Sequence, residues 1–253
     1  MSRLREFSFW LPQPRQVPGR SSHSYAGQSM SKLALGCLGL IWSMVCCAQS
    51  IPSVLEWRGI FEEVRGHALF RELDVRYAKA PAENVGYTPV GVLPNRHSTC
   101  AVVIAEGDNP KMQAIMDFGS NPDQVHTLLV LAAAHELGHC LRVRHKQMSP
   151  QFWALVAATD EGSPQRRFME RQASLEEAYA DAYALVYIHD ISPQRFGEAL
   201  RLMTALRTDP YFETPMYQVR PLYDVLARHG LDNSLPLQHR VESIVQQARF
   251  RQN

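Results

Sequence analysis

Residues 135–139 read His-Glu-Leu-Gly-His, and this stretch has the residue types and spacing best suited to chemistry. Because an α-helix turns by about 100° per residue, His135 and His139 would project from the same helix face. Two imidazoles at this spacing can bind one divalent metal ion, and Glu136 would lie beside a water molecule that the ion acidifies. A carboxylate there can accept a proton during attack on a carbonyl. We therefore predict that His135 and His139 bind one Zn²⁺ per chain and that Glu136 is a general base.

The motif follows an unbroken apolar run, residues 128–134, which favours a buried helix. Burying two histidines and a glutamate without partners is costly, so a metal ion is the better explanation for them. A chance match to a short motif is the alternative, and this apolar context argues against it.

A catalytic zinc ion usually has three protein ligands, and Glu177 is our preferred third ligand. It belongs to the stretch 177–181, Glu-Ala-Tyr-Ala-Asp, and on a helix it would share a face with Asp181. Asp181 could then accept a hydrogen bond from one ligand imidazole and fix its tautomer. The alternative is that Glu177 only forms a capping box with Ser174, or belongs to a solvated helix face.

Two other residues compete for the third position. His145 stands ten residues after His135, but no Gly or Pro between Cys140 and Ser149 would turn the chain. On a continuous helix it would point away from His135 and His139. Cys100 could bind as a thiolate, but its flanking residues do not match the pattern of peptide deformylases.

The two motifs in this order, 135–139 followed by 177–181, resemble those of the gluzincin zinc metallopeptidases, and most closely the HtpX and CAAX-prenyl-protease group. A segment from His239 to Ile244 is faintly similar to a later segment of that group. The resemblance implies Zn²⁺ held by His135, His139 and Glu177, with Glu136 as general base and Asp181 orienting an imidazole. It also implies that the strand before the metal helix, over 99–105, pairs with an extended substrate. The sequence lacks that group's additional transmembrane helices and has no Pro after His239, so a smaller secreted relative fits better.

A residue that stabilises the developing oxyanion is also required. Our preferred candidate is His239, a catalytic residue in this interpretation, together with Arg240; the alternative is that the two simply begin a helix. Tyrosines at three positions are further candidates: Tyr179, Tyr211 and Tyr223.

The N-terminal region is typical of a secretory signal peptide. Lys32 precedes an apolar stretch, 33–45, that is short for a membrane span, and small residues end it at Ala48. We predict an upstream, disordered extension over 1–29, a signal peptide over 30–48 and a single zincin-like domain over 49–253. A retained membrane anchor is the alternative. The signal predicts a periplasmic or secreted protein.

Composition excludes some functions and leaves others open. A net charge of +1 over 253 residues, without a basic stripe, gives no sign of nucleic-acid binding. Of five cysteines only Cys100 and Cys140 follow the signal segment. In an oxidising compartment they could form a disulfide, with two buried thiols as the alternative.

The remaining elements must position these residues. Apolar spacing predicts a helix over 53–68, strands over 73–80, 99–105 and 112–118, and an irregular stretch over 85–93. Asn121-Pro122 is typical of a helix start, and this helix should run through the metal motif to about Gln147. Further helices are expected over 151–159, 165–189, 193–207, 217–229 and 238–250.

These elements predict an α+β, zincin-like fold: a small N-terminal mixed sheet over 49–120 packs on a helical region over 121–253, with the metal helix at the junction. The predicted function is hydrolysis of peptide bonds in a peptide or protein substrate. Two alternatives belong to other classes: a metal-binding zincin-fold protein without proteolytic activity, and a zinc amidohydrolase of the cell envelope. The sequence predicts no oligomeric state.

Overall fold

The computed structural model describes residues 51–85, 88–94, 99–209 and 219–249. The predicted extension and signal peptide, residues 1–48, lie outside these ranges, as does Tyr211. Within the described ranges, none of the helices has both the length and the apolar character needed to cross a membrane.

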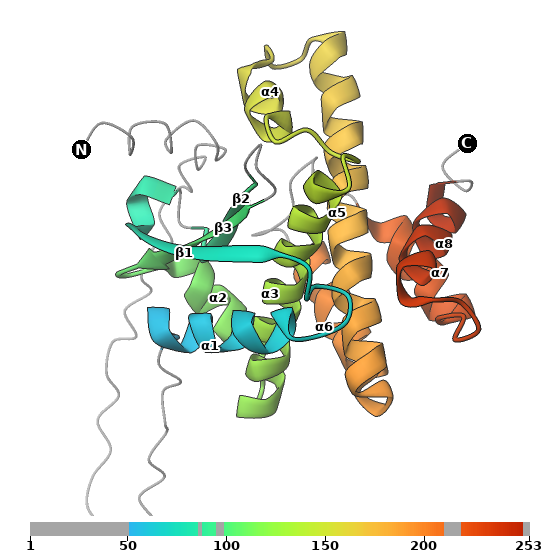
Figure 1. Cartoon of the computed structure of the whole chain (residues 1–253). Helices are drawn as coiled ribbons and strands as arrows, with labels where there is room; N and C mark the ends of the chain where they lie inside the picture. The colour runs from blue at the N-terminus through green and yellow to red at the C-terminus, as the bar shows by residue number, and fades with distance from the viewer. Residues whose placement is uncertain (1–50, 86–87, 95–98, 210–218, 250–253) are drawn as a thin grey trace, which may run out of the picture.

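The described residues form an α+β arrangement in which one small sheet is followed by a set of helices, as predicted (Figure 1). In chain order the elements are α1 (Val54–Arg65), β1 (Asp74–Pro81), η2 (Ala82–Val85), β2 (Val90–Pro94), β3 (Thr99–Glu106), α2 (Pro110–Phe118), α3 (Pro122–Arg144), α4 (Phe152–Ala158), α5 (Pro164–Ile191), η3 (Pro193–Arg195), α6 (Phe196–Thr208), α7 (Arg220–His229) and α8 (Leu237–Arg249). The metal motif lies in α3, which packs between the sheet and α5.

The sheet has the order β1-β3-β2, with β1 parallel and β2 antiparallel to β3. The predicted pairing of strand 99–105 with a substrate is therefore wrong, because β3 has a neighbour on each edge. Its apolar run explains the position: Val102, Val103 and Ile104 are all buried, as in strands covered on both faces. The edge strand beside α3 is β2, which lies in the stretch predicted to be irregular. The backbone hydrogen bonds between β2 and β3 stabilise this strand despite Gly91, a residue type that disfavours strands.

Residues 112–118, predicted as a strand, belong instead to helix α2. The Asn109 side chain accepts a hydrogen bond from the Met112 backbone N–H at 3.0 Å, and Pro110 occupies the first turn. Met112 and Met116, four residues apart, form the buried face. The capping residues decide the structure here, since so short an apolar run fits either a helix or a strand.

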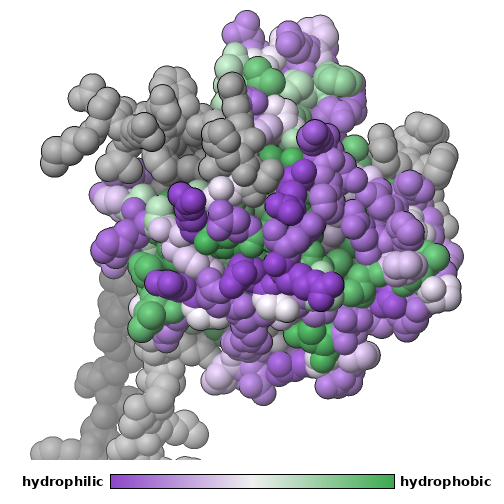
Figure 2. Space-filling view, viewed as in Figure 1, coloured by the Kyte–Doolittle hydropathy of each residue, from purple (hydrophilic) through white to green (hydrophobic). Residues whose placement is uncertain are grey.

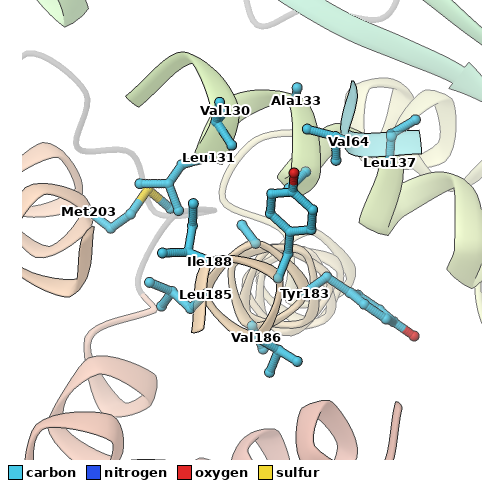
Figure 3. Packing of buried hydrophobic residues seen from close by; sticks show 14 of the residues in the cluster. Val64, Val130, Leu131, Ala133, Leu137, Tyr183, Leu185, Val186, Ile188 and Met203 are labelled. Atoms are coloured by element: carbon cyan, nitrogen blue, oxygen red, sulfur yellow. The ribbon is translucent and has the colours of Figure 1, made fainter. Parts of the chain in front are cut away.

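Helix α5 lies at the centre of the apolar core, with side chains of α1, α3 and α6 around it (Figure 3). It passes very close to α3 at Gly138. A Cβ atom at this position would lie 3.1 Å from the Tyr183 Cβ and 3.2 Å from the Ala180 Cα, which is tighter than most real contacts. Glycine in the metal motif and small residues along α5 therefore allow the two helices that carry the predicted ligands to approach each other.

A disulfide joins Cys100 of β3 to Cys140 of α3, which decides between the two alternatives left by the sequence. Both cysteines are buried, so the bridge lies inside the core. It attaches the sheet to the metal helix one residue after His139.

We expect loss of this bridge to lower the stability of the protein. The bridge joins cysteines 40 residues apart, and opening a loop of this size costs about 3–4 kcal/mol in the chain-entropy description. The double variant Cys100→Ala/Cys140→Ala should therefore unfold at a clearly lower urea concentration than the oxidised wild type. Wild-type protein unfolded in reductant is the control and should show a similar loss. Unchanged midpoints in both would contradict the prediction.

Candidate metal centre

The structure brings the three predicted ligands together. His135 and His139 lie one turn apart on α3, and Glu177 faces them from α5. All three residues are buried, and one ligand atom of each lies within 4.8 Å of the others. The Nε2 atoms of the two histidines are 3.2 Å apart, and they lie 3.4 Å (His135) and 3.5 Å (His139) from the Glu177 carboxylate oxygens.

These separations fit a metal ion. Ligand atoms at about 2.0–2.1 Å from a tetrahedral Zn²⁺ lie about 3.3–3.4 Å from one another. Two imidazole nitrogens and one carboxylate oxygen are also a donor set typical of catalytic zinc sites. The buried His-His-Glu group can therefore hold a metal ion without rearrangement of the helices.

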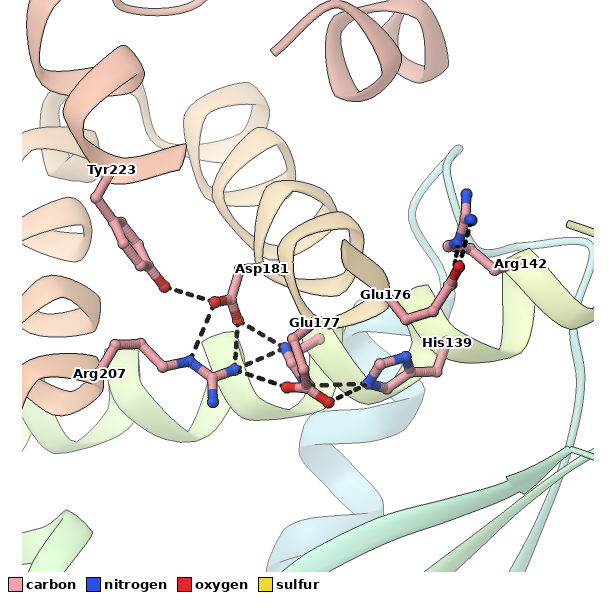
Figure 4. A network of polar contacts seen from close by, with 8 residues as sticks. His139, Arg142, Glu176, Glu177, Asp181, Arg207 and Tyr223 are labelled. Carbon is pink, nitrogen blue, oxygen red and sulfur yellow. Dashed lines mark hydrogen bonds and ion pairs between the residues drawn. The ribbon is translucent and has the colours of Figure 1, made fainter. Parts of the chain in front are cut away.

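Asp181 has the position predicted for it, one turn after Glu177 and against His135. Its Oδ1 lies 2.7 Å from the His135 Nδ1, and it also accepts hydrogen bonds from Tyr223 and Arg207 (Figure 4). Burial opposes ionisation, but the Arg207 charge and the His135 hydrogen bond outweigh it and hold the pKa of Asp181 well below its usual range. Since an ionised carboxylate only accepts, the proton of His135 is assigned to Nδ1. In neutral His135 the Nε2 lone pair is then directed at Glu177 and His139, where a metal ion would bind.

The Glu177 carboxylate is ionised as well. Burial raises its pKa, but His139, His135 and Arg207 together lower it below the usual value for a glutamate. Arg207 Nη2 lies 3.2 Å from the Glu177 Oε2. A negatively charged carboxylate in this place attracts a divalent cation.

Glu136 lies at the edge of the group and is half-buried. Burial raises its pKa, and the neighbouring His135 and His139 partly offset this rise. No hydrogen bond or ion pair joins its carboxylate to another residue of the described ranges. This carboxylate is therefore available to accept a proton near the metal group.

Helix α4 covers one side of the group with an aromatic ring. The Trp153 indole lies edge-on to the His139 imidazole, with ring centroids 5.9 Å apart. α4 is held on α5 by its own small apolar cluster, in which Val156 packs on Ala173.

Together α4 and the start of α5 project from the body, and Figure 2 shows apolar patches on this projection. Two of the strongly exposed apolar side chains lie here, Leu155 and Phe168.

The two competing third ligands lie outside the metal group. The His145 Nε2 lies 2.7 Å from a Glu72 carboxylate oxygen, because α3 continues as a regular helix to Arg144 and turns His145 away. Cys100 is bonded to Cys140 and has no thiolate to offer. Of the three candidates, Glu177 alone joins the histidines.

The prediction of His239 as an oxyanion-stabilising residue is not supported, and we correct it. His239 is exposed on α8, while Val241, two residues later, faces inward, so the histidine points to the other side of this helix. Arg240 donates to the carbonyls of Leu235 and Asn233, away from the metal group.

The tyrosine candidates have different positions. Tyr179 hydrogen-bonds Glu242 of α8 and packs on Arg142, so it joins helices rather than contacting the metal group. Tyr223 is buried, and its hydroxyl donates to the Asp181 Oδ2 at 2.6 Å. Tyr223 therefore supports Asp181, which in turn contacts the predicted ligand His135.

Sequence reasoning missed Arg207 altogether. It stands in the last turn of α6, in a region that carries no motif, and it reaches Asp181 and Glu177 only because α6 packs beside α5. No local pattern distinguishes it from the other arginines of the chain.

No family model, curated protein or solved structure matches the chain. The resemblance to gluzincins therefore stays a prediction from the two sequence motifs.

Proposed function

We propose that this chain is a zinc metallopeptidase with a zincin-like fold and a gluzincin-type site. The observation that carries the proposal is the convergence of His135, His139 and Glu177, whose facing ligand atoms lie 3.2–3.5 Å apart. The neighbouring Glu136 carboxylate has no hydrogen bond or ion pair with another residue of the described ranges. A site built only to store metal would have no need of a base at this position.

The residues would divide the chemistry as follows. His135, His139 and Glu177 hold the ion, which when bound polarises a substrate carbonyl and acidifies water. Glu136 accepts a proton from the water that attacks the peptide carbon, and it passes this proton to the nitrogen of the leaving amine as the C–N bond breaks. Asp181 keeps His135 in the tautomer that presents Nε2 to the ion.

Two features near the site suit a peptide substrate. β2 has one edge that pairs with no described strand, and it packs beside the metal helix. An extended peptide could add to such an edge through backbone hydrogen bonds. Trp153 supplies an apolar surface beside His139 on which a substrate side chain could lie.

A periplasmic or secreted location is part of the proposal. The sequence predicts a signal peptide over residues 30–48, and the buried Cys100–Cys140 disulfide is typical of an oxidising compartment. Fractionation of cells that express the full chain tests it, since export should remove the segment that ends at Ala48.

The test of the function is metal content measured together with cleavage of an unfolded protein. We expect about one zinc per chain, cleavage that a chelator abolishes, and recovery when Zn²⁺ is returned. Bound metal without cleavage would favour the non-proteolytic metal-binding alternative. Cleavage of an envelope amide but not of peptides would favour an amidohydrolase. Absence of bound metal would overturn the proposal.

A further inference from the structure

The Arg207 guanidinium contacts Glu177, a predicted metal ligand, and also Asp181, the hydrogen-bond partner of the predicted ligand His135. Its Nε and Nη2 donate to the two carboxylate oxygens of Asp181 at 3.0 and 2.7 Å, and Nη2 also donates to Glu177 at 3.2 Å (Figure 4). The side chain is 14% exposed, although it comes from the end of α6. The Arg207 guanidinium therefore bridges the carboxylates of Asp181 and Glu177.

The charges of the site show why a cation is needed there. Glu177 and Asp181 are both buried, and Arg207 compensates one of their two negative charges. With neutral histidines, an ionised Glu136 and Zn²⁺, the charges of the site sum to zero. Without Arg207 and without metal, neutral histidines would leave the charges of both buried carboxylates uncompensated, which costs considerable free energy.

We propose that Arg207 is a positioning residue that acts as the built-in counter-cation of the metal centre. Its hydrogen bonds hold the Glu177 and Asp181 carboxylates in place while no metal is bound, and the ion takes over part of the charge compensation when it binds. This inference depends on the proposed metal site but not on peptidase activity.

Arg142 provides a matched comparison within the same pair of helices. It is a buried arginine of α3 that forms two hydrogen bonds with Glu176 of α5. Within the described residues, no hydrogen bond or ion pair joins it to His135, His139 or Glu177. Removing it should weaken the packing of α3 on α5 by the same amount with and without metal.

The experiment compares melting temperatures in chelator and in excess Zn²⁺ for the wild type, Arg207→Met and Arg142→Met. We expect Zn²⁺ to raise the Tm of the wild type. Arg207→Met should melt lower than the wild type in chelator, and its Zn²⁺-induced rise should exceed that of the wild type by about 4 °C or more. Arg142→Met should melt lower in both conditions and show the wild-type rise.

Each result has one meaning. An equal or smaller rise in Arg207→Met would overturn the counter-cation role, whereas no rise in the wild type would overturn the metal site itself. An Arg207→Met chain that folds only with Zn²⁺ would support the role. If it folds in neither condition, Arg207→Lys decides: it keeps the charge without the forked geometry and should show the wild-type rise. A Zn²⁺-induced rise in the Tm of Arg207→Lys that differs from the wild-type rise by about 4 °C or more would overturn the inference.

Discussion

The variant Glu136→Gln is expected to bind zinc like the wild type and to lose almost all of its hydrolytic activity. Glutamine has nearly the shape of glutamate but cannot accept a proton at its amide near neutral pH. A positioned general base typically contributes a factor of about 10²–10⁴ to the rate, so kcat should fall by at least about a hundredfold.

The structure explains why this substitution should separate binding from chemistry. The Glu136 side chain forms no hydrogen bond or ion pair within the described ranges, so its replacement by the similarly shaped glutamine breaks no such interaction. The proposed ligands His135, His139 and Glu177 should keep their positions on α3 and α5. The unfolding transition and metal content of Glu136→Gln should therefore match those of the wild type.

The measurement is the cleavage rate of an unfolded protein at saturating substrate, with zinc content determined on the same sample. Glu161→Gln is a matched control, because Glu161 is exposed and lies in the turn before α5. It should keep full activity. Wild-type activity in Glu136→Gln would overturn the proposed role of Glu136, even if the zinc site is present.

Local signals predicted the elements that carry the ligands. The Asn121 cap, with Pro122 after it, correctly places the start of α3, and the small residues of the 177–181 stretch fit its close approach to α3. Hydrogen bonds within a few residues decide such features, so a single sequence contains them. The same holds for the facing of Glu177 and Asp181, which follows from helical spacing.

Features that depend on distant parts of the chain were not predictable in this way. β3 is a central strand because β1 and β2 both pair with it. The residues of β3 alone do not specify which strands pair with it. Arg207 reaches Asp181 through the packing of α6 on α5, 26 residues away in sequence. His239 was proposed from a faint similarity, and the orientation of α8 places it on the surface.

Replacing Glu177 should strongly weaken metal binding. Glu177→Ala removes one of the three ligand atoms and the negative charge closest to both Nε2 atoms. Loss of a residue that only supports a ligand typically costs a factor of 10–100 in metal affinity, and loss of the ligand itself should cost about a hundredfold or more. We therefore expect Glu177→Ala to be isolated without zinc and to be inactive.

His145→Ala is the matched comparison, because His145, ten residues after His135, is the histidine that competes with Glu177 as third ligand on sequence grounds. In the structure its imidazole pairs with Glu72 at 2.7 Å on the outer side of α3. Its replacement should leave zinc content and activity unchanged and lower the stability by no more than about 1 kcal/mol, as for an exposed ion pair.

Competition with a chromogenic chelator measures the zinc affinity of both variants directly. Glu177→Gln should be included, because it keeps the shape of the side chain while removing the charge that attracts the ion. A weakened affinity in Glu177→Ala and Glu177→Gln, with wild-type affinity in His145→Ala, is the expected pattern. The reverse pattern would show that the helix after His139 turns back toward the metal, and both the gluzincin-type ligand set and the counter-cation role of Arg207 would then be wrong.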